Sequence, residues 1–242
     1  MTTGTVAVVP DRPYTLLSCA VSIDGYLDDA SPDRLILSGP EDLDEVDALR
    51  AAADAILVGA GTIRADNPRL LVRDPARIAA REAAGKPPHP LRVTVTATGE
   101  LDPVARFFTG PGTPLVYCAS TAVPAAEKML KDKAVVIDAS ADLSLAAVLQ
   151  DLHHERTVAT LLIEGGARIL RDALAGNLAD ELRLAIAPFF VADPSAPRFA
   201  LPAPYPHTAA HPMTLLSLRR VGEVAVHHYR LSGQPDRTAP NR

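Results

Sequence analysis

The sequence has no tryptophan, only two cysteines and only four lysines beside twenty arginines. Cys19 and Cys118 lie 99 residues apart in apolar runs, which excludes a disulfide scaffold and predicts buried free thiols in a reducing compartment. No run approaches the ~18 apolar residues of a membrane span, and the N-terminus lacks the basic start and apolar core of a signal peptide. We therefore expect a cytoplasmic, unprocessed protein.

Charge of one sign is not concentrated anywhere in the chain. The 24 basic and 29 acidic residues give a net charge of −5, and no basic tail or basic run appears. Nucleic acids and anionic membranes attract clustered basic residues, so neither is an expected partner.

The length of 242 residues, 48% of them apolar and 22% charged, is typical of a folded domain. It leaves little room for a second full enzyme domain. We predict one domain over residues 12–232, a flexible N-terminus over 1–11 and a disordered tail over 233–242.

Short apolar runs alternate with helical stretches, which predicts an α/β fold with a mostly parallel central sheet and an antiparallel C-terminal hairpin. The expected strands are 14–21, 54–58, 91–97, 114–118, 134–137, 158–163 and 181–191, with hairpin strands 214–220 and 224–231. The expected helices are 41–53, 75–84, 125–130, 144–153 and 167–175. Pro188 inside the strand 181–191 favours an edge or bulged strand.

Ligands bind beyond the carboxyl ends of the strands in open α/β sheets, so the residues directly after each strand are the first candidates for a binding site. Glu164, Gly165 and Gly166 follow one strand and precede a helix. Two glycines allow a close backbone approach, and a helix N-terminus favours a phosphate or pyrophosphate. Glu164 is placed to accept hydrogen bonds from a polar substrate; an ordinary tight turn is the alternative.

A second polar segment, residues 59–68, also follows a strand. It begins like the dinucleotide motif G-x-G-x-x-G, but Arg64 replaces the third glycine and no acid ends the next strand, which argues against a Rossmann dehydrogenase. We expect a loop in which Thr62 offers a hydroxyl and Asp66 a carboxylate, with an ordinary turn as the alternative.

Four arginines surround this loop, and they suggest an anionic substrate because guanidinium groups bind phosphate with two hydrogen bonds. They are Arg50, Arg64, Arg69 and Arg73. A solvated surface is the plainer interpretation for any one of them. Ser22 could point into a cleft at the end of the first strand, whereas Asp24 is better explained as a turn residue.

Other chemistries lack their signatures. Residues 153–155 contain H-x-E, but the P-C-x-x-C that completes a zinc deaminase site is missing, and no other metal-ligand cluster exists. No G-x-S-x-G elbow supports a serine hydrolase. His227 and His228 lie on the last predicted strand, where a structural role is favoured.

Four segments together resemble a known family: SCAVSIDGYL (18–27), LRAAADAILVGAGTIRADNPRLLVR (49–73), LLIEGGARIL (161–170) and DELRLAIAP (180–188). They are similar to the reductase domain of riboflavin biosynthesis, usually the C-terminal half of a bifunctional deaminase/reductase. The resemblance covers residues 12–232 and implies a dihydrofolate-reductase-like fold with helices on both faces of the sheet. It implies a homodimer, with residues 182–191 and the C-terminal hairpin as interface elements.

The resemblance also implies a reaction and a site. NADPH would reduce the ribosyl group of a phosphoribosylamino-pyrimidine to a ribityl chain by hydride transfer, and no side chain stands out as a general acid. The implied cofactor residues are Ala20, Ile36, Thr62, Asp66, Thr98, Gly165, Gly166, Ala167, Arg168, Ile169 and Leu170. The implied substrate residues are Arg34, Arg50, Leu70, Arg73 and Glu164, with the arginines near the phosphate.

Two departures bear on the substrate. Arg34 stands where the family usually has a substrate-binding serine, and Ile36 where it usually has an aromatic residue. A reductase acting on another pterin or pyrimidine, including dihydrofolate, or on a secondary metabolite, is therefore an alternative. A non-catalytic NADPH-binding regulatory protein is another.

Overall fold

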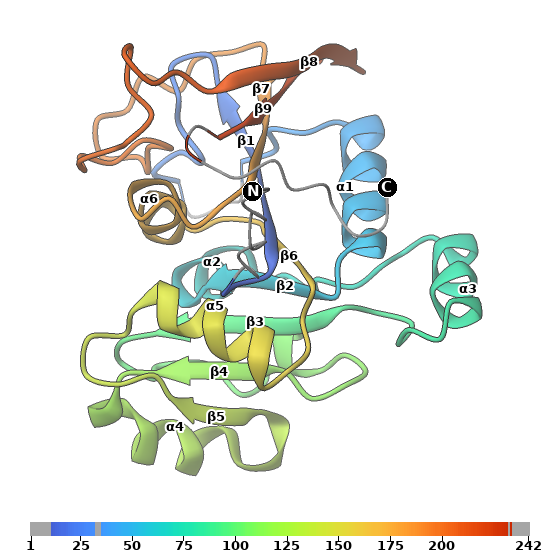
Figure 1. Cartoon of the computed structure of the whole chain (residues 1–242), viewed down its shortest axis with the longest axis vertical. Helices are drawn as coiled ribbons and strands as arrows, with labels where there is room; N and C mark the ends of the chain where they lie inside the picture. Colours follow the sequence, from blue (N-terminus) through green and yellow to red (C-terminus); the bar gives the residue numbers. More distant parts are fainter. Residues whose placement is uncertain (1–10, 32–34, 232, 234–242) are drawn as a thin grey trace, which may run out of the picture.

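The structure is a computed structural model that describes residues 11–31, 35–231 and 233. Apart from Asp11 and Gly233, the predicted terminal segments lie outside the described residues. Its centre is one nine-stranded sheet (Figure 1). The strands are β1 (Tyr14–Ser22), β2 (Ala55–Gly59), β3 (Leu91–Thr96), β4 (Leu115–Cys118), β5 (Val135–Asp138), β6 (Thr160–Ile163), β7 (Glu181–Ala187), β8 (Thr214–Val221) and β9 (Val224–Arg230).

The strand order is β5-β4-β3-β2-β6-β1-β7-β9-β8. The strands from β5 to β7 run parallel, and β9 is antiparallel to both β7 and β8. The predicted mostly parallel sheet with an antiparallel C-terminal hairpin is confirmed. Because β3, β2, β6 and β1 are parallel neighbours, their carboxyl ends lie next to one another. Ligands bind at this edge in open α/β sheets.

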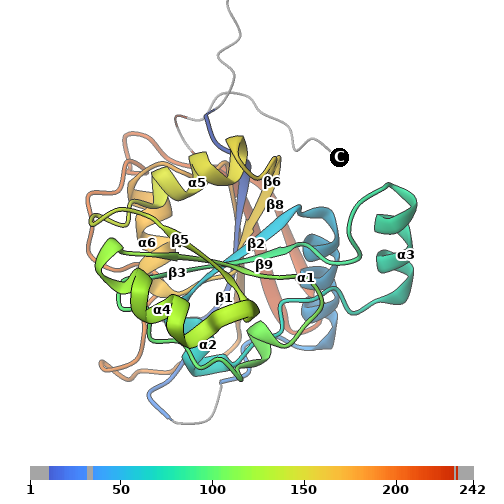
Figure 2. The ribbon, with the colours of Figure 1, turned by 90° about the horizontal axis from the view of Figure 1, so that it is seen from below.

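Helices cover both faces of the sheet, as the resemblance implied. They are α1 (Pro40–Ala52), α2 (Ala60–Asp66), α3 (Pro75–Ala83), α4 (Val123–Leu130), α5 (Leu145–His154) and α6 (Ala167–Ala175). In β2, Leu57 packs with α5 and α6 in one core cluster, while Ile56 and Val58 pack with α2 and α4 in another. Figure 2 shows α5 and α4 on opposite sides of the strands. Because both faces of β2 are buried, its sequence is a continuous apolar run.

Two sequence expectations are wrong. The strand beginning at Glu181 ends at Ala187 and lies between β1 and β9, so it is neither an edge strand nor a bulged one. Proline has no N–H group, and a strand with neighbours on both sides therefore ends before Pro188. The predicted loop after β2 is helix α2, which buries Ile63 and ends at Asn67, a residue with φ of 43°.

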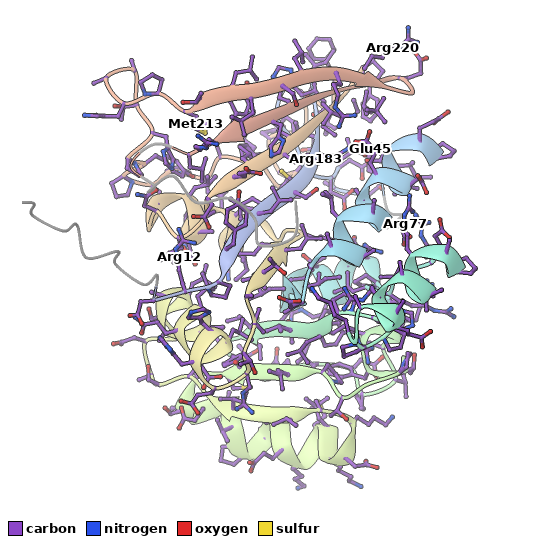
Figure 3. The ribbon with its side chains drawn as sticks, turned by 45° about the vertical axis from the view of Figure 1, so that its right-hand side comes forward. Arg12, Glu45, Arg77, Arg183, Met213 and Arg220 are labelled. Carbon is purple, nitrogen blue, oxygen red and sulfur yellow. The ribbon has the colours of Figure 1, made fainter. Side chains whose placement is uncertain are left out.

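Ion pairs fasten α1 to the antiparallel end of the sheet. Arg183 of β7 is buried and donates to Asp42 (2.5 Å) and Glu45 (2.9 Å) of α1. Arg219 of β8 donates two hydrogen bonds to the same Glu45, at 2.7 and 3.0 Å. Figure 3 shows Glu45 and Arg183 facing each other between the helix and the sheet. These contacts fix α1, the helix that carries Arg50.

Candidate functional site

The turn after β6 is tied to the end of β2. The Glu164 N–H donates to the Leu57 carbonyl (3.1 Å), and the Gly59 N–H donates to the Gly165 carbonyl (3.3 Å). Gly165 and Gly166 have φ angles of 119° and 86°, which side-chain-bearing residues adopt only with strain. The two glycines thus let the chain turn directly from β6 into α6.

This turn also meets α2. A Cβ atom on Gly166 would lie 3.3 Å from Thr62 Oγ1 and 3.5 Å from Gly59 Cα. Thr62 and Gly166, 104 positions apart, are therefore neighbours. The first N–H groups of α6 have no partner within the helix, and its positive dipole end lies at this turn. A hydroxyl, a helix N-terminus and glycines without side chains together suit an anionic group such as a pyrophosphate.

Leu170, one of the cofactor residues that the resemblance implies on α6, does not fit that role. The Leu170 N–H already donates to the Gly166 carbonyl at 3.0 Å, and the Leu170 side chain is fully buried. Ile169 also packs its side chain into the core, against Gly59, so only its N–H can face the turn. Leu170 therefore has no group to offer a ligand, and the donors available at the turn end with Ile169.

Arg50 and Glu164, two predicted substrate residues from distant parts of the chain, meet in the structure. The guanidinium donates to both carboxylate oxygens of Glu164 at 2.6 Å. The side chains are 18% and 11% exposed. Burial lowers the pKa of Arg50, but the hydrogen bonds and charge of Glu164 outweigh it and raise that pKa above its ordinary value. The pair places two hydrogen-bonded charged groups next to the glycine turn, because Glu164 directly precedes Gly165.

The other predicted arginines separate into two groups. Arg73 lies against α1, where its Nη2 donates to the Leu43 carbonyl at 2.7 Å. Arg64 donates to the Glu100 carbonyl at 3.0 Å and is exposed, as is Arg69. Leu70 is buried in the core with φ of 53° and shapes the loop between α2 and α3. The structure therefore places Arg73 beside the helix that carries Arg50, whereas Arg64 lies against the segment after β3.

Thr98 and Ala20 lie near the carboxyl ends of β3 and β1. Thr98 is exposed after β3, and its Oγ1 accepts the Glu100 N–H at 3.3 Å. Asp66 ends α2, and Ala20 is half-buried on β1. Arg168 is exposed on the first turn of α6. Ile36 is 76% exposed, and Arg34 lies outside the described residues.

Asp24 has the structural role expected from the sequence. Its carboxylate accepts hydrogen bonds from the Ser22 hydroxyl (2.6 Å) and from the N–H groups of Val191 (3.1 Å) and Ala192 (2.8 Å). Desolvation raises the pKa of Asp24, but these hydrogen bonds outweigh it and hold the pKa at about 2. Ser22 is fully buried and bonded to Asp24, so it does not line a cleft.

Asp47, a buried acid of α1, is not among the site residues predicted from the sequence. The pattern of Leu43, Val46 and Leu49 placed the apolar side of the helix elsewhere. A signal existed in the sequence: an acid three residues before Arg50 is close to it on the helix surface.

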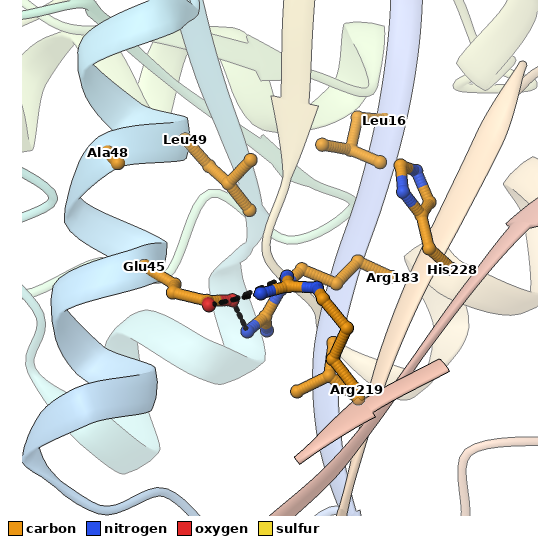
Figure 4. Close-up of a pocket in the computed structure, with 8 residues that line it drawn as sticks. Leu16, Glu45, Ala48, Leu49, Arg183, Arg219 and His228 are labelled. Carbon is orange, nitrogen blue, oxygen red and sulfur yellow. Dashed lines mark hydrogen bonds and ion pairs between the residues drawn. The ribbon is translucent and has the colours of Figure 1, made fainter. Parts of the chain in front are cut away.

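A cavity of about 250 Å³ lies away from this edge, between α1 and strands β1, β7, β8 and β9 (Figure 4). Its apolar lining comes from Leu16, Ala48, Leu49 and Val226, and its charged lining from Glu45, Arg183, Arg219 and His228. None of the predicted site residues lines it. In the described part of the chain, no helix is long and apolar enough to cross a membrane.

Comparison with known proteins decides the family. The model of the RibD C-terminal domain matches residues 13–226. The chain belongs to this family. A curated relative from Archaeoglobus fulgidus, named 2,5-diamino-6-ribosylamino-4(3H)-pyrimidinone 5′-phosphate reductase, is 36% identical over 187 residues, 77% of this chain and 85% of the relative. The protein of that name from Methanothermobacter thermautotrophicus is 34% identical over 181 residues, 74% of this chain and 80% of the relative.

The fold agrees with the family. A crystal structure of a pyrimidine reductase-like protein from Corynebacterium diphtheriae superposes with a TM-score of 0.78 at 23% identity, covering 95% of this chain and 97% of that one. The resemblance to a riboflavin-pathway reductase domain, and the reductase function predicted from it, are confirmed at the level of the RibD C-terminal domain family.

Proposed function

We propose that this member of the RibD C-terminal domain family is an NADPH-dependent reductase acting on a phosphorylated ribosylaminopyrimidine, whose ribosyl group it reduces to ribityl. The observation that carries the proposal is the joining of the glycine turn, Thr62 and the Arg50–Glu164 pair at one edge of the sheet. The two relatives named above are pyrimidinone 5′-phosphate reductases, which supports the same substrate class.

The described residues fit a dinucleotide. A side chain at position 166 would fill the space beside Thr62, so the bare backbone leaves a cradle for phosphate oxygens. In our assignment the N–H groups of Gly166 to Ile169 and the Thr62 hydroxyl hold the pyrophosphate. Arg168, exposed on the first turn of α6, contacts a cofactor phosphate. Ala20, half-buried on β1, lies along the nicotinamide.

NADPH, when bound, supplies the hydride. The chain supplies position and charge, since a reaction in which the cofactor carries the electrons depends mainly on holding the two reactants in register. Glu164, held by Arg50, is oriented to accept hydrogen bonds from ribose hydroxyls. Arg50 and Arg73 provide positive charge for the substrate phosphate, because guanidinium groups pair with phosphate in two-pronged geometry.

The test measures the oxidation of NADPH or NADH by the purified protein in the presence of a candidate substrate. Turnover is measured with the diaminopyrimidinone ribosyl phosphate, its deaminated uracil form and dihydrofolate, each with NADPH and with NADH. We expect turnover with one of the first two and a preference for NADPH. Turnover of dihydrofolate alone would show a different substrate class, and tight NADPH binding with no reduction would show a regulatory protein.

The family resemblance also leads us to propose a homodimer. β8 forms one edge of the sheet, and Leu215, Leu216 and Leu218 on it are exposed. An exposed apolar edge strand is a typical pairing surface. Leu218→Glu should convert the protein to monomers in light scattering, whereas Val135→Glu on the opposite edge strand, β5, should not. A monomeric wild type would end this part of the proposal.

Two buried free thiols, Cys19 and Cys118, support the proposed cytoplasmic, reducing compartment.

A further inference from the structure

Asp47 lies in the middle of α1 with only 2% of its side chain exposed. Its Oδ1 accepts the Arg73 N–H at 2.7 Å, and its Oδ2 accepts the Asp74 N–H at 3.1 Å. Arg77 Nη1 also donates to Oδ2, at 3.0 Å. A buried carboxylate is costly unless several donors surround it. Here all three donors come from one stretch of chain, residues 73–77.

The segment that Asp47 holds has no regular structure of its own. Residues 68–74 join α2 to α3, and Leu70 within them has φ of 53°. Two consecutive N–H groups bound by one carboxylate fix the direction of the backbone at Arg73. Burial raises the pKa of Asp47, but the bonds from these N–H groups and from Arg77 outweigh it and lower the pKa. The group therefore acts as a carboxylate.

The same helix carries Arg50 one turn further on. Arg50 is fixed to Glu164 by its two hydrogen bonds of 2.6 Å. Burial lowers the pKa of Arg50, and Glu164 and then Asp47 raise it, so Asp47 acts electrostatically on this residue as well. One buried acid thus binds the backbone of Arg73 and also interacts electrostatically with the Arg50 guanidinium.

The Arg73 guanidinium is held more loosely than its backbone. Its side chain is 57% exposed, donates to the Leu43 carbonyl and keeps its Nε 3.5 Å from Asp47 Oδ1. An exposed guanidinium at this distance can exchange these contacts for a phosphate at little cost. The backbone bonds to Asp47 do not need to break for that exchange.

We propose that Asp47 is a positioning residue that sets Arg73 relative to the Arg50–Glu164 pair and so forms the subsite for the substrate phosphate. The inference rests on the proposed function, because it assigns a phosphorylated substrate to this edge of the sheet.

The test compares Asp47→Asn with Asp44→Asn. Asp44 lies one turn earlier on α1, carries the same charge and pairs with Arg77 at 2.7 and 2.8 Å, but its side chain is 64% exposed. The asparagine NH2 at position 47 would face a backbone N–H that needs an acceptor. We expect KM for the phosphorylated pyrimidine to rise at least about tenfold in D47N. KM for NADPH and for the unphosphorylated nucleoside should stay within about twofold, and D44N should resemble wild type.

Ribose 5-phosphate binding, measured by calorimetry with ribose as the control, gives a readout that needs no turnover. Binding by wild type and D44N, with loss in D47N and in Arg73→Ala, supports the inference even if the pyrimidines are not reduced, an outcome that removes only the proposed function. An equal rise in KM for both forms of the pyrimidine, or no ribose 5-phosphate binding by wild type, overturns it. If D47N does not fold, Asp47→Glu replaces it. KM for the phosphorylated pyrimidine should again rise while KM for NADPH and for the unphosphorylated nucleoside stays nearly unchanged.

Discussion

Removing the Arg183 guanidinium should cost far more stability than removing that of Arg219, although both arginines bind Glu45. The Arg183 side chain is 6% exposed and that of Asp42 is 1% exposed, so Arg183→Met leaves a carboxylate buried without its cation. Within the described residues, Asp42 Oδ2 already has no hydrogen-bond partner. Breaking a buried pair by removing one partner costs about 3–5 kcal/mol.

The control is built into the same cluster. Arg219 is 53% exposed, and an exposed ion pair contributes less than about 1 kcal/mol, so Arg219→Met should change little. The double variant Arg183→Met with Asp42→Leu removes both charges. It should recover most of the loss, because apolar replacement of a buried pair is often neutral or stabilising.

Urea unfolding followed by far-ultraviolet circular dichroism measures these differences. With a slope of about 3 kcal/mol per molar urea, a loss of about 4 kcal/mol lowers the midpoint by more than about 1 M. Equal midpoints for R183M and R219M, or a double variant less stable than R183M alone, would contradict the expected cost of leaving Asp42 buried without a cation. Either result would mean that Asp42 is solvated or otherwise compensated.

Three further outcomes are expected. Gly166→Val should weaken NADPH binding at least about tenfold, measured by fluorescence titration, whereas Gly85→Val, with φ of 72° and open space, carries similar backbone strain and should leave binding unchanged. The pKa of Asp24 is lowered to about 2, so its stabilising effect is complete above its ordinary pKa of 3.8 and is lost as the pH falls through 2; the stability difference between wild type and Asp24→Asn should shrink over that range, and a constant difference would contradict this. Burial raises the pKa of Cys19 to about 12 and of Cys118 to about 11, so neither should react with a thiol reagent near neutral pH until urea unfolds the chain.

The sequence predicts α1 well but not its buried residues. Leu43, Val46 and Leu49 recur at helical spacing, yet these three are only half-buried, and the fully buried residues of the helix are Asp42 and Asp47. The partners of the two acids arrive from β7 and from the segment after α2. No local pattern announces a cation or a pair of N–H groups that tertiary structure brings in.

The site divides in the same way. The glycine turn after β6 could be identified as an anion site from local rules, since a strand, two glycines and a helix follow one another. The contact between Thr62 and Gly166 could not, because it depends on β2 and β6 being neighbours in the sheet. The glycines at 59 and 61 made a loop the expected structure where the chain forms α2, a helix that buries Ala60 and Ile63.

The attachments of α1 have a consequence for the way this protein can vary. Asp42 and Glu45 bind β7 and β8, Asp47 binds the segment after α2, and Arg50 binds the turn after β6. A relative's helix grafted alone would lose partners in three places at once. Exchange between homologues should therefore succeed only when the helix travels together with its partners in β7 and β8, in the segment after α2 and at the turn after β6. Strands β7 and β8 thereby become part of what selection must conserve to keep Arg50 in place.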